Sequence, residues 1–132
     1  MTFKSGVFGL GVLLAAVCIV SLTSASARAE KPFFEQFKAK YVKAESDKPN
    51  DVALREASGK AGCGICHMGK DKKKRNAYGQ ELAKLLSHED AKDAQKIQDA
   101  LDKVAGAKSK AGDPKAPSYG EIIASGKLPA AK

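Results

Sequence analysis

The chain has 132 residues, with 23 Lys and Arg against 15 Asp and Glu, which gives a formal net charge of +8. This length suits one small domain and excludes a large multidomain enzyme. The sequence has no tryptophan and few other aromatic residues, so its apolar core is thin. A small chain with a thin core often needs a disulfide, a metal or a covalent cofactor to hold its fold together.

The first 29 residues have the anatomy of a secretory signal peptide. Lys4 gives a positive start, residues 7–22 are almost wholly apolar, and Ala27-Arg28-Ala29 is a small-x-small cleavage signal. The apolar stretch is shorter than the roughly 20 residues that span a bilayer, which disfavours a retained membrane anchor. We therefore expect cleavage after Ala29, with residues 1–29 as the signal peptide and residues 30–132 as the mature domain.

Cys18 lies inside the apolar stretch of this leader. Val17 precedes it, whereas a lipoprotein signal needs a small residue at that place, so Cys18 is expected to leave with the leader. The mature domain then keeps only Cys63 and Cys66. A leader of this kind sends a protein to the periplasm or an equivalent compartment outside the cytoplasm, so we expect an exported protein.

The mature chain opens with an amphipathic pattern. Pro32 suits a first helical position, and Phe33, Phe37 and Tyr41 recur every four residues. This spacing predicts a helix from Pro32 to about Asp47, with its aromatic residues on one face. The stripe alone does not decide whether these aromatics form plain core or line a cofactor.

Two further helices are predicted on either side of a basic segment. The first covers residues 52–60, with Asn50 or Asp51 as its cap, and runs into glycines at positions 59, 62 and 64, where the backbone must turn tightly. Residues 70–75 are expected to form an exposed loop. The next helix covers residues 76–87 and places on one side Tyr78, Leu82, Leu85 and Leu86.

The last part of the chain predicts two more helices. Ser87 and Asp90 form a capping-box-like start for a helix over residues 88–106, which buries Ile97, Leu101 and Val104. After a loop, Ser118 is expected to cap a short helix over residues 119–129. No alternating strand pattern is present. The predicted fold class is therefore all-α, a small bundle of about four or five helices.

The segment with the most chemical content is Cys63-Gly64-Ile65-Cys66-His67. Four residues of the mature chain could ligate zinc: Cys63, Cys66, His67 and His88. However, adjacent Cys66 and His67 are awkward to aim at one small ion, and the spacing misses the usual finger patterns. A thioredoxin-like dithiol normally lies at a strand-to-helix junction, which an all-α chain lacks. A bare disulfide leaves His67 without a role.

The remaining interpretation uses every residue of the motif, because C-x-x-C-H is the attachment signature of c-type haem. Two thiols about one helical turn apart can form thioethers with the two vinyl groups of one macrocycle. The next residue then places an imidazole beneath the iron. We therefore expect haem c attached through Cys63 and Cys66, with His67 as the proximal iron ligand.

With these residues the mature chain resembles a small monohaem c-type cytochrome of class I. Besides the motif, Tyr78-Gly79-Gln80-Glu81-Leu82 falls where that family has a glycine-proline-x-leucine segment that packs on the haem. The resemblance implies a cytochrome c-like haem domain that carries single electrons, since the cofactor itself does the redox chemistry. We therefore expect an electron carrier and not an enzyme.

The sequence departs from the class I pattern at the distal iron ligand. That family usually supplies a methionine from its C-terminal half, but the mature chain has only Met68. A residue adjacent to His67 cannot swing round the macrocycle, so Met68 is expected to pack at the haem edge or lie on the surface. Three options stay open. His88 could bind the iron; a lysine, asparagine or tyrosine could bind; or the site could be open and serve a small-ligand sensor, a carrier or weak peroxidase-like activity.

A basic run follows the motif directly, with Lys70, Lys72, Lys73, Lys74 and Arg75. It can be a solvated segment that keeps the protein soluble. It can also form a positive rim at the exposed haem edge that steers an acidic redox protein. Nucleic acid is not an expected partner, because the protein is exported and has no recognition helix. Contact with a membrane is expected only through a redox partner.

Overall fold

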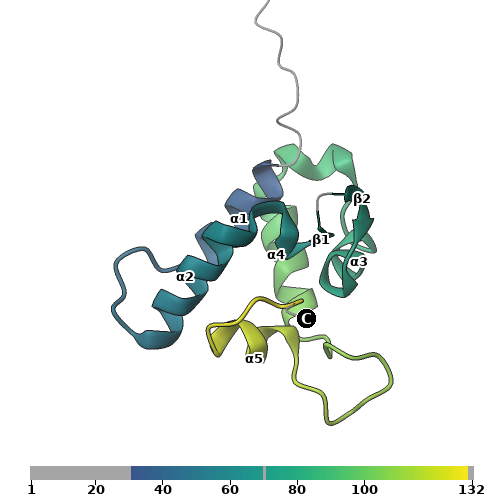
Figure 1. Cartoon of the computed structure of the whole chain (residues 1–132). Helices are drawn as coiled ribbons and strands as arrows, with labels where there is room; N and C mark the ends of the chain where they lie inside the picture. Colours follow the sequence, from purple (N-terminus) through teal and green to yellow (C-terminus); the bar gives the residue numbers. More distant parts are fainter. Residues whose placement is uncertain (1–30, 70, 131–132) are drawn as a thin grey trace, which may run out of the picture.

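The computed structural model describes residues 31–69 and 71–130, so the predicted leader and Lys70 lie outside the described residues. This part of the chain is mainly helical, as expected, with five α-helices and one small two-stranded sheet (Figure 1). None of the described helices is long and apolar enough to cross a membrane. The elements in chain order are α1 (Lys31–Tyr41), α2 (Pro49–Ala61), η1 (Gly62–Ile65), β1 (His67–Met68), β2 (Asp71–Arg75), α3 (Ala77–Ala83), η2 (His88–Lys92), α4 (Ala94–Ala105) and α5 (Tyr119–Ala124).

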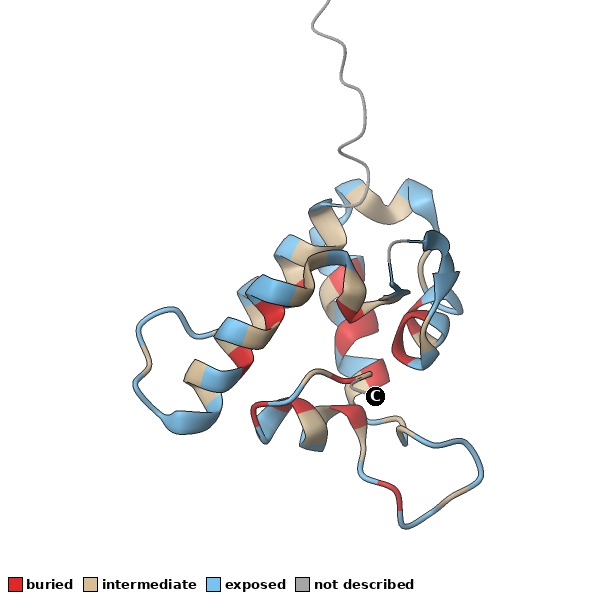
Figure 2. Cartoon of the chain, viewed as in Figure 1, coloured by how far each residue is buried: buried red, intermediate tan, exposed pale blue. Residues whose placement is uncertain are grey.

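The centre of the fold is α4, which packs against α1, α3 and α5. Its buried face carries Ile97, Ala100, Leu101 and Val104 at helical spacing, which agrees with the predicted core of this helix. Figure 2 shows that buried positions of α3, α4 and α5 face the interior, whereas β2 is exposed along its length. Burial of this one apolar stripe against three helices is the main force that holds the fold together.

A row of aromatic rings continues the core from α1 to α5. Phe37 and Tyr78 meet edge to face with ring centroids 6.2 Å apart, and Tyr78 and Tyr119 do so at 5.1 Å. Tyr41 packs on Phe37 at 5.1 Å and donates a hydrogen bond to the carbonyl of Leu101 at 3.1 Å. These contacts compensate for the absence of tryptophan by linking three helices through aromatic surface.

The first two helices differ in their bounds from the prediction. Helix α1 ends at Tyr41 rather than near Asp47, because Arg55 of α2 donates to the backbone carbonyls of the segment that follows, those of Lys43, Ala44 and Ser46. Helix α2 begins at Pro49, with Lys48 as its N-cap residue. The prediction of Asn50 or Asp51 as the cap is therefore wrong.

The segment predicted as one helix from residue 88 to residue 106 is broken in two. Ser87 and Asp90 do form a capping box, but it opens the short 3-10 helix η2. Asp93 then takes a non-helical conformation and caps α4 by accepting a hydrogen bond from the backbone N–H of Lys96 at 2.9 Å. The cap of α5 is confirmed, because Ser118 and Glu121 form a capping box there.

The expectation of a chain without strands is wrong at the basic segment. Residues Asp71–Arg75 form strand β2, which pairs antiparallel with β1 and places Arg75 opposite His67. Gly69 has a positive φ of 60° in the connection between them, a conformation that glycine adopts without a steric penalty. The basic side chains of β2 are nevertheless exposed, as the loop prediction required. The hairpin fixes this charge beside the cysteine-histidine motif.

Candidate cofactor pocket

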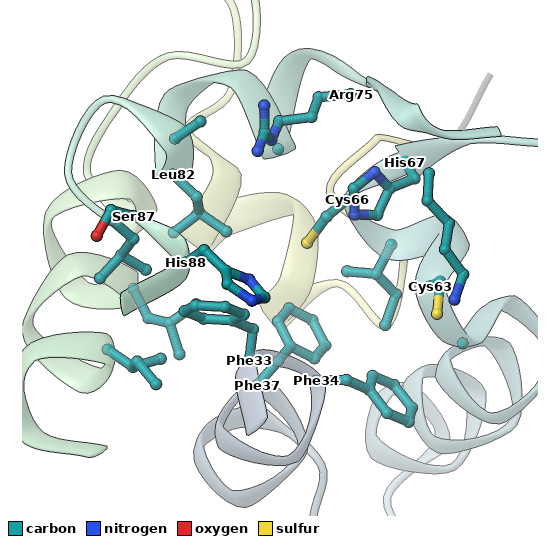
Figure 3. Close-up of a pocket in the computed structure, with 18 residues that line it drawn as sticks. Phe33, Phe34, Phe37, Cys63, Cys66, His67, Arg75, Leu82, Ser87 and His88 are labelled. Atoms are coloured by element: carbon teal, nitrogen blue, oxygen red, sulfur yellow. The ribbon is translucent and has the colours of Figure 1, made fainter. Parts of the chain in front are cut away.

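A pocket opens between α1, α3, α4, η2 and the segment that carries the motif. Its cavity volume is about 180 Å³, and about 1000 Å³ of space lies between its walls when the open side is included. Ligand and cofactor pockets are typically apolar clefts with a few convergent polar groups. This pocket has that character, since aromatic and aliphatic side chains make up most of its lining and two histidines and two cysteines reach it (Figure 3).

The motif forms one wall of this pocket. Gly62 turns the chain out of α2 with a positive φ of 50°, and the 3-10 helix η1 then carries Cys63 and Ile65. Ile65 is buried in the core and anchors the motif from below. The thiols of Cys63 and Cys66 are free, and both residues line the pocket. Both predicted attachment residues are thus accessible from one cavity.

Asn76 connects this wall to α3 through both ends of its side-chain amide. Its Nδ2 donates to the carbonyls of Gly64 at 3.2 Å and Ile65 at 2.9 Å. Its Oδ1 accepts from the backbone N–H of Gly79 at 2.9 Å, which makes Asn76 the N-cap of α3. Its own N–H donates to the Cys66 carbonyl at 3.0 Å. One residue therefore holds the motif backbone against the start of α3.

Gly79 also belongs to this contact, and neither its role nor that of Asn76 was predicted from the sequence. Gly79 is buried and its Cα faces the motif so closely that no side chain fits. The signals were available: asparagine is a favoured N-cap residue, and a glycine inside a helix often marks a close backbone approach. The predicted Tyr78–Leu82 segment does reach the pocket, through Gly79 and Leu82.

The thiol of Cys66 is shielded from solvent. Burial raises the pKa of Cys66 to about 12, with a further contribution from the neighbouring Cys63. A thiol with this pKa is protonated at neutral pH, so Cys66 is not itself a thiolate nucleophile in this environment.

His67 lies on β1, next to Cys66, and lines the same pocket. Its Nδ1 is buried and has no hydrogen-bond partner among the described residues. A buried polar nitrogen without a partner is unusual and calls for a ligand or another explanation. His67 is thus placed beside both cysteines with one ring nitrogen unsatisfied.

His88 reaches the pocket from the opposite side. It is the first residue of η2, and its imidazole points from that helix toward the space between Cys66 and the phenylalanines of α1 (Figure 3). The residue is exposed overall because the pocket is open there. The structure therefore brings His88 into one cavity with the three motif residues, although it lies 22 positions after Cys66 and 25 positions after Cys63 in the sequence.

The aromatic stripe of α1 contributes both to the core and to the lining of the pocket. Phe33, Phe34 and Phe37 line the pocket, and Phe37 is at the same time a buried core residue. Met68 has a different position. It is 53% exposed and is not among the residues that line the pocket, so it lies on the surface beside the motif.

The four residues that could ligate zinc do not form one compact cluster. Within residues 31–69 and 71–130, no group of three or more His, Cys, Asp or Glu side chains is gathered tightly enough to hold a metal ion alone. The four zinc candidates instead lie on two walls of a cavity. Two thiols and an imidazole on one wall, a second imidazole opposite and aromatic rings between them suit a haem with covalent attachment.

Comparisons of the chain with protein-family models, with curated proteins and with solved structures each found no match.

Proposed function

We propose that the protein is an exported c-type cytochrome that carries single electrons through one covalently attached haem. The observation that carries this proposal is the shared pocket, which Cys63, Cys66 and His67 line together. In this proposal the two cysteines form the thioethers and His67 binds the iron. The resemblance of the motif to that of class I monohaem cytochromes supports the same interpretation.

The bound haem would supply the one-electron chemistry, and the chain would supply its environment. Phe33, Phe37 and Leu82 present apolar surface to the pocket, which excludes water and lowers the local polarity around a bound group. Asn76 and Gly79 hold the motif backbone in place, so the attachment residues need little rearrangement. A rigid site suits electron transfer, because little of the surroundings must reorganise when the charge changes.

The other interpretations of the motif have less support. Strand β1 is only two residues long and leads into a hairpin rather than into a helix, so the motif is not at the strand-to-helix junction of a thioredoxin-like fold. Zinc would require the two walls of the pocket to close on one ion.

We further propose that the redox partner is an acidic protein that docks at β2. The strand carries Lys72, Lys73, Lys74 and Arg75, all exposed, and Lys72 and Arg75 also line the pocket. Pairing with β1 holds this charge next to His67. A positive surface at the edge of a redox site raises the encounter rate with a negative partner, and salt weakens the effect.

The test is covalent attachment. The full chain, including its leader, is produced in a bacterial host that matures c-type cytochromes, and the purified protein is denatured and reduced in alkaline pyridine. We expect a c-type haemochrome spectrum that stays with the polypeptide, and a mature protein that begins at Glu30 by mass spectrometry. Haem that separates from the unfolded chain, or no haem at all, would refute the proposal.

Cysteine variants make this test specific. Cys63→Ser and Cys66→Ser each leave one vinyl group unreacted, so each should shift the haemochrome band to longer wavelength or abolish attachment. Cys18→Ser is the matched control, because we expect Cys18 to leave with the leader. A spectrum that changes in the Cys18 variant but not in the other two would show that the motif is not the attachment site.

A further inference from the structure

We infer that His88 is the second axial ligand of the haem iron, on the side opposite His67. This inference rests on the proposed function, and it assigns the ligand that the sequence left open between His88, another side chain and an unoccupied site. It also decides between an electron carrier and a ligand-binding protein, because only an unfilled axial position admits water or a small ligand.

His88 enters the pocket from the side opposite the motif. The motif approaches from η1 and β1, while His88 comes from η2, on the far side of the cavity (Figure 3). The phenylalanines of α1 and Leu82 of α3 lie between and around these walls. Two imidazoles on facing walls of an apolar pocket match the two axial sides of a flat group that is held between them.

Other side chains at or near the pocket are less suited than His88 to bind the iron from that side. Met68 is outside the lining and lies on the surface. Arg75 carries a guanidinium, which offers hydrogen-bond donors and no lone pair. Lys72 belongs to β2, which is paired with the strand that carries His67, so it approaches from the same wall as the motif. Among these residues, His88 combines an imidazole, a common metal ligand, with a position on the opposite wall.

The backbone at His88 is held in place by hydrogen bonds and an ion pair. The N–H and hydroxyl of Ser87 donate to Oδ2 of Asp90 at 2.7 and 3.0 Å. Oδ1 of Asp90 pairs with Nζ of Lys96 on α4 at 2.7 Å. The capping box therefore fixes the start of η2, and the ion pair ties η2 to the central helix. The side chain of His88 projects from an anchored turn rather than from a free loop.

The turn between α3 and α4 accounts for the position of residue 88 at the pocket. The chain between α3 and α4 makes η2 instead of continuing as helix, and this turn brings residue 88 to the open side of the pocket. Two imidazole ligands give a six-coordinate, low-spin iron. They also hold the reduction potential below that of a histidine–methionine pair, since methionine as an axial ligand raises it.

The experiment uses the mature protein from the same host and compares it with His88→Ala and His88→Met. For the wild type we expect visible and electron paramagnetic resonance spectra of a low-spin iron, both in the purified protein and in the crude periplasmic extract. The reduced wild-type protein should not bind carbon monoxide. His88→Ala should become high-spin and bind carbon monoxide, and added imidazole should restore the low-spin spectrum. His88→Met should stay low-spin with a higher potential. Glu89→Ala, an exposed neighbour in the same turn, is the matched control and should behave as the wild type.

The outcomes separate the two proposals. A haemochrome that remains covalent while His88→Ala keeps an unchanged low-spin spectrum would refute the ligand assignment and leave the cytochrome proposal standing. A high-spin wild type that binds carbon monoxide would also refute it and would favour the small-ligand function. If no haem attaches to the wild type, both proposals fail. Should His88→Ala not accumulate, the potential and spectrum of His88→Met decide, because an unchanged potential in that variant contradicts iron ligation by residue 88.

Discussion

Gly79 of α3 lies directly against Cys66, so that a Cβ on the glycine would come within 2.0 Å of the Cys66 carbonyl oxygen and 2.9 Å of its carbonyl carbon. Both sides of this contact are backbone, which cannot move aside as a flexible side chain could. The backbone of α3 and the backbone of the motif are therefore in direct contact, and this contact holds the wall of the pocket in place.

The first prediction follows from this contact. Gly79→Ala should lower the free energy of unfolding by about 1–3 kcal/mol or more, because overpacking of a closed contact forces backbone shifts. Gly59→Ala in α2 is the control, since a Cβ there meets nothing within 4 Å and alanine favours a helix by up to about 1 kcal/mol. Denaturant unfolding followed by circular dichroism measures both. Equal stability of the two variants would contradict the close approach.

The second prediction concerns Asn76. Asn76→Ala removes the cap of α3 and the hydrogen bonds to the motif carbonyls, so it should cost about 2–4 kcal/mol. Asn76→Asp keeps an acceptor for the Gly79 N–H but loses the Nδ2 donor that reaches Gly64 and Ile65. Asn76→Asp should therefore still lower the free energy of unfolding by about 1–2 kcal/mol.

Ser118→Ala provides the comparison for Asn76, because it removes the cap of α5 without touching the motif. It should cost about 1 kcal/mol and leave the yield of covalent haem unchanged, whereas the Asn76 variants should lower that yield. Chemical denaturation and the haemochrome assay measure the two effects. If the Asn76→Asp variant were as stable as the wild type, the hydrogen bonds from the Asn76 amide to the motif carbonyls would not contribute to stability.

The third prediction is a pH dependence that arises from Tyr41. Burial, and then the nearby charge of Asp102, raise the pKa of Tyr41 from 10.0 to about 12. Because the folded state favours the neutral phenol, its contribution to stability is fully present below pH 10 and is lost as the pH rises toward 12. Tyr41→Phe also loses the hydrogen bond to Leu101, so we expect it to be about 1 kcal/mol less stable at neutral pH.

The comparison of Tyr41→Phe with the wild type isolates this residue, since the other buried tyrosines titrate in both proteins. Free energies of unfolding measured at several pH values should fall less steeply for the variant between pH 10 and pH 12. Two parallel curves over that interval would contradict the assigned pKa shift.

The fourth prediction addresses β2 and depends on the proposed electron transfer. Replacement of Lys73 and Lys74 by glutamine should slow electron transfer to an anionic oxidant such as hexacyanoferrate(III) by roughly threefold to tenfold at low ionic strength. Lys110→Gln with Lys115→Gln removes the same charge from the loop before α5, on the other end of the molecule (Figure 1). Stopped-flow rates over a range of salt concentrations measure both double variants. If the two slow equally, net charge and not the position of β2 controls the encounter.

Sequence patterns predicted the helices where local signals agreed with the final packing. The buried stripe of α4 and the cap at Ser118 depend on spacing and on neighbours a few residues away, and both are confirmed. Strand β2 was missed because five exposed, mostly basic residues carry no alternating pattern. That strand forms because it pairs with β1 and because the N–H of Asn76 donates to the Cys66 carbonyl at the base of the hairpin.

The candidate site also has one part that the local sequence determines and one part that depends on tertiary packing. Cys63, Cys66 and His67 are neighbours in the chain, so their proximity needed no knowledge of the fold. The approach of His88 depends on the end of α3 at Ala83 and on the break between η2 and α4. Those features arise from tertiary packing and from the conformation of Asp93. A periodicity argument that expects one continuous helix cannot supply them.

The hydrogen bond from the N–H of Asn76 to the Cys66 carbonyl joins the two ends of the segment that carries β2. Within that segment His67, Lys72 and Arg75 line the pocket, whereas Lys73 and Lys74 are exposed and do not. Mutations at Lys73 and Lys74 that adapt the protein to a different partner can therefore accumulate without disturbing the pocket. In a diverging lineage, the identity of the partner and the integrity of the cofactor site would be inherited as separate traits.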